Sequence, residues 1–596
     1  MFVRPILLAA ISFSMPIVAR AGAPNVVIVM TDDQGYGDLA CHGNPVLKTP
    51  NLDQLHNESL RLTDYHVSPT CSPTRAALLT GHWSNRTGVW HTIMGRSMLR
   101  AGEVTFAQLF RDAGYETGMF GKWHLGDNYP FRPEDRGFTE VMRHGGGGIG
   151  QTPDYWNNAY FDGSYWHNGK PTPVQGFCTD VFFDYAKRFI RKQKANGKPF
   201  LAYIATNAPH GPMHAPKAFT NAYKQIENKG LRHFYGMIAN IDDNVGALRD
   251  FLADEGLAAN TIFIFTTDNG TSAGAKIHNS GMRGNKGSPY DGGHRVPFFM
   301  HWPEGGYATG RDVNGLSAHV DVTPTLLSLC GIESPEHLTF DGVDLTKALR
   351  GHSANWPDRL LITDSQRVKD PIKWRQSSVM SHRWRLVEGK ELYDIQRDPG
   401  QRLDVAASHA EVVARLQKFY DKWWDELLPT FQEPAIIVLG HQADNPARLT
   451  SHDWITTKRS PWNQKLVREA MNGDANTGYW NVEFSRTGDY EVRLRRWPEE
   501  TNAALDAALP VGEMVPGVRP FRANPGIAIH PVVAQLRVGT VIYTTTVLPG
   551  TREAVFHLPA KAGVTEMEAG FVSEDGTKHG AYYAYVSGPV ESAGTP

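Results

Sequence analysis

Three short runs of the chain are apolar except at their ends, namely residues 25–30, 200–205 and 261–266. A strand without polar positions is buried on both faces, which is typical of a parallel sheet. Between the runs the apolar positions recur with the period of an amphipathic helix, at residues 105–113, 179–194 and 233–255. Strands that alternate with helices predict an α/β fold, in which helices sandwich a large, mainly parallel sheet.

The pattern changes twice towards the C-terminus. From about residue 373 it predicts short antiparallel strands and a helix over 410–428, and after residue 429 it alternates with period two. We therefore expect a catalytic α/β domain at 22–372, a small antiparallel α+β subdomain at 373–430 and an extra β-rich accessory domain at 431–596.

The first residues predict a signal peptide. A charged start that includes Arg4 precedes a mostly apolar run at 5–18, and Ala19-Arg20-Ala21 has the form of a cleavage site. The alternative, a membrane anchor, needs a longer run. The remaining sequence has no apolar stretch of membrane-spanning length, so we expect an exported protein, periplasmic or secreted, with no membrane contact after cleavage of residues 1–21.

Composition narrows the class of protein. Among 596 residues, 60 Lys and Arg face 62 Asp and Glu, and 41% are hydrophobic. This composition excludes a disordered chain and a protein that binds nucleic acid through bulk charge. The four cysteines allow at most two disulfides and have no zinc-site spacing; they are Cys41, Cys71, Cys178 and Cys330.

Two of the predicted strands end in oxygen ligands. Asp32 and Asp33 follow the run at 25–30, and Asp268 and Asn269 follow the run at 261–266. Ligands collect at the carboxyl ends of parallel strands, and oxygen-only ligands favour a hard cation such as Ca²⁺ or Mg²⁺. The alternative for each pair alone is a helix cap or turn.

Cys71 stands where a helix is expected to begin, four residues before Arg75. A thiol at a helix N-terminus lies beside an anion site, which is typical of a nucleophilic cysteine. The alternative is a buried structural cysteine.

The segment Cys71-Ser72-Pro73-Thr74-Arg75 resembles the signature of the type I, formylglycine-dependent sulfatases, arylsulfatase-like members of the alkaline phosphatase superfamily. Further blocks resemble this family in its order, at residues 31–33, 121–126, 208–212, 267–270, 284–287 and 292–297. Together they cover about residues 25 to 430. One departure is Asp291, where the family often has Glu.

The resemblance implies that Cys71 is oxidised to Cα-formylglycine by a formylglycine-generating or anaerobic sulfatase-maturing enzyme. The hydrated aldehyde then offers one hydroxyl for attack on sulfur and a second whose collapse to the carbonyl releases sulfate. One divalent ion, usually Ca²⁺ with Mg²⁺ as the alternative, is implied at Asp32, Asp33, Asp268, Asn269 and the modified Cys71.

The resemblance also implies roles for five further residues. Arg75 holds the hydroxyl of the aldehyde, and Lys122 and Lys286 bind sulfate oxygens. His124 takes the proton that allows the collapse, and His210 protonates the leaving alcohol.

The expected substrate is a sulfated carbohydrate, because the chain combines an export signal, many aromatic residues and an extra β-rich domain. Two alternatives are a phosphonate monoester or phosphodiester hydrolase of the same superfamily and a non-catalytic sugar-binding protein. Trp480 and Trp497 in the accessory domain are expected to pack in its core rather than stack on sugars.

Overall fold

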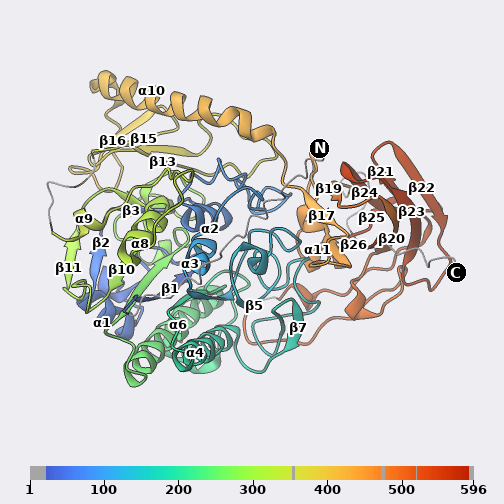
Figure 1. Ribbon diagram of the computed structural model, residues 1–596, viewed down its shortest axis with the longest axis horizontal. Helices are drawn as coiled ribbons and strands as arrows, with labels where there is room; N and C mark the ends of the chain where they lie inside the picture. The colour runs from blue at the N-terminus through green and yellow to red at the C-terminus, as the bar shows by residue number, and fades with distance from the viewer. Residues whose placement is uncertain (1–21, 352–355, 357, 471–476, 519, 590–596) are drawn as a thin grey trace, which may run out of the picture.

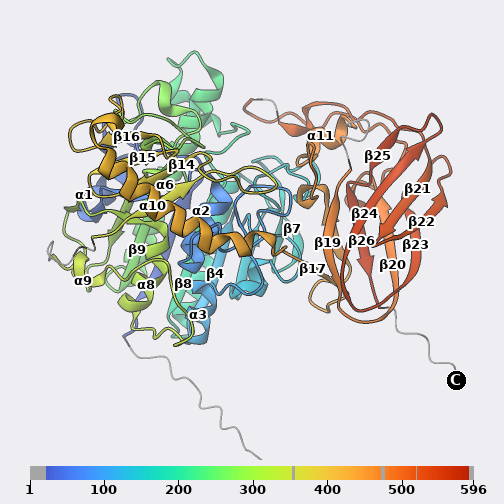
Figure 2. The ribbon, with the colours of Figure 1, turned by 90° about the horizontal axis from the view of Figure 1, so that it is seen from above.

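The structure is a computed structural model that describes residues 22–351, 356, 358–470, 477–518 and 520–589. Figures 1 and 2 show an α/β region and a β-rich C-terminal region side by side. The predicted signal peptide, residues 1–21, lies outside the described residues. Within the described ranges, no helix has the length and apolar character needed to cross a membrane.

A ten-stranded sheet forms the centre of the α/β region. Its five middle strands are all parallel, in the order β9 (Thr261–Thr267), β1 (Asn25–Thr31), β8 (Phe200–Ala205), β4 (Glu116–Gly121) and β5 (Glu140–Arg143). The outer strands are β11 (Arg311–Val313), β2 (Leu60–Leu62) and β10 (Phe298–His301) on one side, and β6 (Ser164–His167) and β7 (Lys170–Pro173) on the other. The predicted mainly parallel sheet is confirmed, with antiparallel additions at both ends.

Alternate residues of β1 face two separate cores. Val26 and Ile28 pack among side chains of α2 (Cys71–Thr80), α3 (Phe106–Asp112) and α8 (Val322–Cys330). Val27 and Val29 pack among those of α1 (Pro50–Glu58), α4 (Cys178–Ala195) and α6 (Lys229–Asp254). The two sets of helices cover opposite faces of the sheet (Figure 1), which explains why the strand is apolar from Val26 to Met30.

A second, antiparallel sheet lies next to the first, with the order β13 (Leu361–Asp364), β14 (Ser377–Met380), β15 (Trp384–Val387) and β16 (Glu391–Asp394). The helix α10 (Ala410–Leu427) packs across it, at the top of Figure 1. The first strand of this sheet, β13, lies before residue 373, at which the sequence pattern predicts that the small subdomain begins.

The C-terminal region contains two further sheets around one apolar core. One consists of β17 (Ile437–Leu439), β19 (Tyr479–Phe484), β24 (Gly563–Ser573), β21 (Pro531–Val538) and β22 (Val541–Thr546), with β25 (Lys578–Gly580) paired to β24. The other consists of β18 (Ala447–Thr450), β26 (Tyr583–Ser587), β20 (Gly488–Arg495) and β23 (Ala554–Ala560). Trp480 and Trp497 are at most 1% exposed, so the predicted core packing of both is confirmed.

The short elements are α5 (Lys217–Thr220), α7 (Asp291–His294), α9 (Thr346–Leu349), α11 (Gln464–Arg468), β3 (Tyr65–His66), β12 (Ser317–Ala318) and the 3₁₀ helix η1 (Ala40–His42). The C-terminal region is packed firmly against the α/β region, because Trp156 belongs to the C-terminal core. Backbone hydrogen bonds join Thr152 to Trp462 and Val518 to Met213, at 3.1 and 3.0 Å.

Candidate active site

The paired strands β1 and β9 bring four predicted ligands together. Thr31 lies opposite Thr267 in the parallel register, so the residues that follow leave the sheet at the same level. Asn269 Nδ2 donates to Asp33 Oδ1 at 2.8 Å, and the Asp33 amide donates to Asp268 Oδ1 at 3.1 Å. All four side chains, Asp32, Asp33, Asp268 and Asn269, are buried.

Cys71 is the first residue of α2 and is 2% exposed. Its Sγ and one carboxylate oxygen each from Asp32 and Asp268 lie within 4.8 Å of one another. One turn further along, Arg75 donates from Nη2 and Nε to Asp268 Oδ2 at 2.7 and 3.1 Å, and from Nη1 to the Lys122 carbonyl at 2.9 Å. The helix therefore presents the thiol to the strand ends and fixes Asp268 through Arg75.

Two lysines complete the charge balance. Lys122 directly follows β4, and its Nζ lies 2.6 Å from Asp32 Oδ2. Lys286 comes from the loop before α7, and its Nζ lies 2.5 Å from Asp33 Oδ1. Three buried carboxylates thus face three cationic groups, because Arg75 pairs with Asp268.

The cluster nevertheless leaves oxygen atoms without partners. Asp32 Oδ1 and Asn269 Oδ1 are buried and accept no hydrogen bond from any part of the chain that the structure describes. Burial raises the pKa of Asp32, and burial together with the nearby Asp32 charge raises the pKa of Asp268 to about 6. Unpaired buried oxygens call for a ligand, and this oxygen donor set fits a hard divalent cation.

The two predicted histidines lie on either side of a glycine turn. A Cβ at Gly147 would lie 2.1 Å from His124 Nε2, and one at Gly148 would lie 3.7 Å from the His210 ring. His124 has a positive φ of 61°, which aligns its Nε2–H with the Thr92 carbonyl at 2.8 Å. The His124 Nδ1 is buried and has no partner among the described residues.

His210 donates from Nδ1 to the Gly211 carbonyl at 2.6 Å, so its Nε2 carries the lone pair, 3.9 Å from Asp33 Oδ2. Burial lowers the pKa of His210 to about 3, despite the Asp33 charge, and lowers that of His124 well below its usual range. Both rings are therefore neutral near pH 7 in the absence of ligands.

The structure gathers all ten predicted residues in one place, and it adds residues that the sequence did not indicate. A cleft of about 540 Å³ opens over Asp33 and His210, and its far wall comes from the C-terminal region. The residues of that wall are Trp462, Val518 and Phe521.

No local motif marks Trp462, Val518 or Phe521, because their position depends on how the two regions pack. Asn207 was also missed, although it follows β8 closely. Its amide is buried, and neither polar atom has a partner in the described chain. The rule that ligands collect at strand ends could have found it.

Comparisons with known proteins agree with this geometry. The family model described as Sulfatase matches residues 24–332, more than half of the chain, and the model described as N-sulphoglucosamine sulphohydrolase, C-terminal, matches residues 285–423. The chain is 30% identical to human arylsulfatase A over 466 residues, which covers 67% of this chain and 87% of the relative. It is 33% identical to rat N-acetylgalactosamine-6-sulfatase over 381 residues, 56% of this chain and 68% of the relative.

The fold is also similar to the crystal structure of Ps i-CgsB in complex with k-i-k-neocarrahexaose. The TM-score is 0.62 at 27% identity, over 67% of this chain and 92% of the other. The chain belongs to the sulfatase family. It is a sulfuric ester hydrolase of the alkaline phosphatase superfamily.

Proposed function

We propose that this sulfatase is exported, to the periplasm or the cell exterior, and hydrolyses a sulfate ester on a sulfated carbohydrate. It uses a Cα-formylglycine formed from Cys71 and one bound Ca²⁺ or Mg²⁺ ion. The observation that carries the proposal is the position of Cys71, which is buried at the start of α2 against Asp32 and Asp268. The names of two similar proteins support a sugar substrate, because one is an N-acetylgalactosamine-6-sulfatase and the other was crystallised with a neocarrahexaose.

The cation is proposed to bind Asp32, Asp33, Asp268 and Asn269, whose donor set and unpaired oxygens support it. A divalent ion supplies positive charge that stabilises the transferred sulfate group and lowers the pKa of a hydroxyl group beside it. Lys122 and Lys286 touch the same carboxylates. Each ammonium has three donors, so it can bind a sulfate oxygen while it keeps its carboxylate partner.

Arg75 positions Asp268 and is proposed to hold the hydroxyl of the residue at position 71. An aldehyde there would supply, as its hydrate, one hydroxyl that can attack sulfur and a second hydroxyl whose return to the carbonyl would release sulfate, a route that neither cysteine nor serine can take. His124 has a free Nδ1 lone pair that can accept a proton. His210 points Nε2 towards the cleft carboxylate Asp33. We assign to it the transfer of a proton to the leaving alcohol, for which the negative charge of the bound sulfate must first favour protonation of Nε2.

Mass spectrometry of the peptide across Cys71, from the native source, tests the proposal. Conversion of the thiol group to an aldehyde lowers the mass by about 18 Da. Because Cys71 is 2% exposed in the folded protein, we propose that the maturing enzyme acts before folding is complete. A native protein that retains the thiol at position 71 would refute the formylglycine mechanism.

Kinetics separates the sulfatase from the phosphodiesterase alternative. Aryl sulfate should be hydrolysed in preference to aryl phosphodiester, and Cys71→Ala should reduce turnover by about 10⁴-fold or more, because loss of a nucleophile disables the whole catalytic unit. The melting temperature of the variant should stay close to that of the parent. Equal or faster turnover of the phosphodiester would favour the alternative.

The aromatic wall of the cleft is proposed to bind the sugar. Trp462 and Phe521 are partly exposed, and their rings meet edge to face at 6.0 Å. Trp462→Ala should raise KM for a sulfated oligosaccharide by about 10-fold, since aromatic anchors contribute about 1–3 kcal/mol in such sites, and leave KM for a small aryl sulfate nearly unchanged. Trp302→Ala, a partly buried tryptophan outside the cleft, is the control. An equal rise in KM for both substrates in Trp462→Ala would contradict a sugar-binding role of Trp462.

A further inference from the structure

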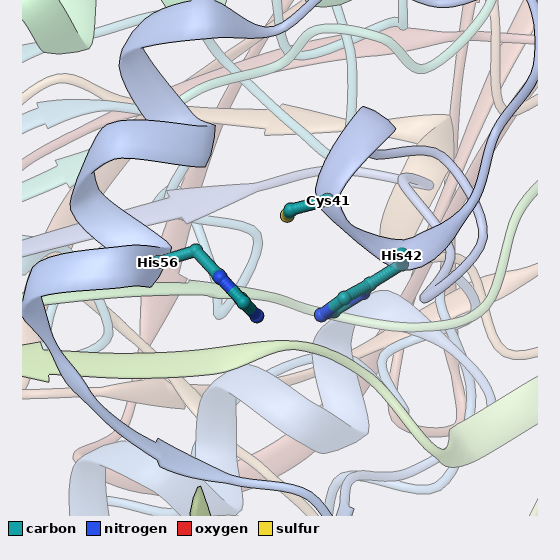
Figure 3. Close-up of side chains that lie close together, drawn as sticks. All are labelled: Cys41, His42 and His56. Atoms are coloured by element: carbon teal, nitrogen blue, oxygen red, sulfur yellow. The ribbon is translucent and has the colours of Figure 1, made fainter. Parts of the chain in front are cut away.

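A second cluster of metal-binding side chains lies outside the active site. Cys41 and His42 belong to η1, and His56 lies in the last turn of α1. One ligand atom of each residue lies within 4.8 Å of the other two. Figure 3 shows the two imidazoles pointing towards each other with the sulfur of Cys41 beside the gap.

Hydrogen bonds fix the orientation of both rings. His42 Nδ1 donates to the Tyr36 carbonyl at 2.7 Å, which leaves the lone pair on Nε2. His56 Nδ1 lies 3.0 Å from Asn57 Oδ1, and the same tautomer satisfies that contact. In the chain that the structure describes, neither Nε2 has a hydrogen-bond partner. A second ring nitrogen held by a carbonyl or amide oxygen is the usual support of a metal-binding histidine.

Aromatic packing holds the rings in place. His42 stacks on Tyr36 with ring centroids 3.9 Å apart. Phe299 meets His42 and His56 edge to face, at 5.7 and 5.3 Å. Each ring is therefore held by neighbouring aromatic side chains and not only by the other ring. All three candidate ligands are partly exposed, so an ion can reach them from solvent.

We propose that Cys41, His42 and His56 bind a Zn²⁺ ion at a site separate from the catalytic cluster. A thiolate and two imidazoles select a borderline or soft metal rather than Ca²⁺. Tetrahedral zinc needs ligand atoms about 3.5 Å apart, with Zn–S about 2.3 Å and Zn–N about 2.0–2.1 Å. Because the present separations are within 4.8 Å, the side chains must close by at most about 1.3 Å. Water takes the fourth position.

Binding must release one proton. The two imidazoles enter as neutral ligands, whereas Cys41 must lose its thiol proton when the Zn–S bond forms. The bound ion would join η1 to the end of α1 and stabilise the folded state by mass action.

Cobalt binding tests the proposal without relying on catalysis. The test uses the full-length Cys71→Ala protein saturated with Ca²⁺. In this protein the thiol of the catalytic cluster is absent and the oxygen ligands of that cluster are occupied. We expect one Co²⁺ per chain to bind with release of one proton and a thiolate-to-cobalt charge-transfer band, and Zn²⁺ to displace the Co²⁺ without further proton release. X-ray absorption of the zinc form should then show one sulfur at about 2.3 Å.

Three further variants make the assignment specific. Cys41→Ala should abolish the band, and His42→Ala and His56→Ala should each weaken metal binding by more than about 10-fold. Cys330→Ala and His382→Ala, a partly exposed cysteine and an exposed histidine elsewhere, should have no effect. Absence of the band in the parent, or its persistence in Cys41→Ala, would overturn the proposal. If Cys41→Ala does not fold, an unchanged Co²⁺ affinity of both histidine variants would overturn it equally.

Discussion

Two buried clusters of carboxylates lie in the α/β region, and they differ in how their charges are compensated. The catalytic cluster contains Asp32, Asp33, Asp268 and Asn269 at the ends of β1 and β9. The second, which we name the Arg385 cluster, contains Asp64, His66, Asp291, His294 and Arg385. Both are almost fully buried.

Arg385 binds its two carboxylates directly. Its Nη2 lies 2.7 Å from Asp64 Oδ1 and its Nε lies 3.1 Å from Asp291 Oδ1. Burial acts to raise the pKa of both acids, but Arg385 outweighs it and holds each pKa below its usual range. In the catalytic cluster burial wins at two of the three carboxylates: the pKa values of Asp32 and Asp268 are raised, whereas Lys286 holds the pKa of Asp33 below its usual range.

The difference separates a structural cluster from a site that needs a ligand. Arg385 comes from β15 of the small sheet, whereas Asp64 and Asp291 belong to the α/β core, so the ion pairs fasten the two together. His66, Asp291 and His294 also lie close enough to hold a metal ion. His66 and His294, however, contact each other at 2.9 Å through Nδ1 atoms. Arg385 binds Asp291 Oδ1, and only the buried Oδ2 of Asp291 has no partner among the described residues.

The largest expected effect comes from removing Arg385. Arg385→Met leaves two buried carboxylates without a cation, which costs about 3–5 kcal/mol of folding free energy. Urea unfolding measures the loss. Arg383→Met, two residues away, removes a guanidinium that is 42% exposed from its ion pair with Asp394, and should cost clearly less stability. If both variants lose a similar free energy of unfolding, Arg385 does not have the special structural role that distinguishes its cluster from the catalytic one.

Calcium should stabilise the protein through the catalytic cluster alone. Addition of Ca²⁺ to chelator-treated protein, at about 100 times its Kd, should increase the free energy of unfolding by about 2.7 kcal/mol. Asp268→Asn should lose most of this response, whereas Asp291→Asn should keep it. Thermal unfolding with and without Ca²⁺ checks both. If Ca²⁺ still stabilises Asp268→Asn but no longer stabilises Asp291→Asn, the ion binds in the Arg385 cluster and the prediction fails.

The smallest expected effect depends on pH. The depressed pKa values of Asp64 and Asp291 contribute stability that is present above the unfolded value of about 3.9 and is lost as the pH falls through the folded values. The difference in unfolding free energy between the parent and Arg385→Met should therefore narrow on acidification below about pH 4, by about 1–2 kcal/mol. Urea unfolding at a series of pH values tests this, and a constant difference would contradict it.

Much of the fold follows from local pattern. The buried strands β1, β8 and β9 are apolar except at their ends because helices cover both faces of the sheet. Period-two burial in β19 and β23 marks a sheet with one apolar face. The alternating pattern over residues 538–547 does not show where one strand ends and the next begins. These residues form the end of β21, a turn at Gly539 with φ of 57°, and then β22.

Asp291 illustrates the limit of reasoning from motifs. In the sequence it is only a departure from the family pattern, whereas in the structure it is the partner of Arg385 from another sheet. The two residues are 94 positions apart, and no periodicity relates them. Their pairing is decided when the small sheet docks on the core.

The sequence by itself determined the strands, the helices and the group of residues at the strand ends, because burial on both faces leaves a strand only its ends for polar chemistry. Tertiary structure alone decided the aromatic wall of the cleft with Trp462 and Phe521, the Arg385 cluster, and the meeting of Cys41, His42 and His56. These contacts form between elements whose relative positions depend on packing rather than on local periodicity. Local hydrophobic pattern fixes each element, but only packing fixes which side chains of different elements meet.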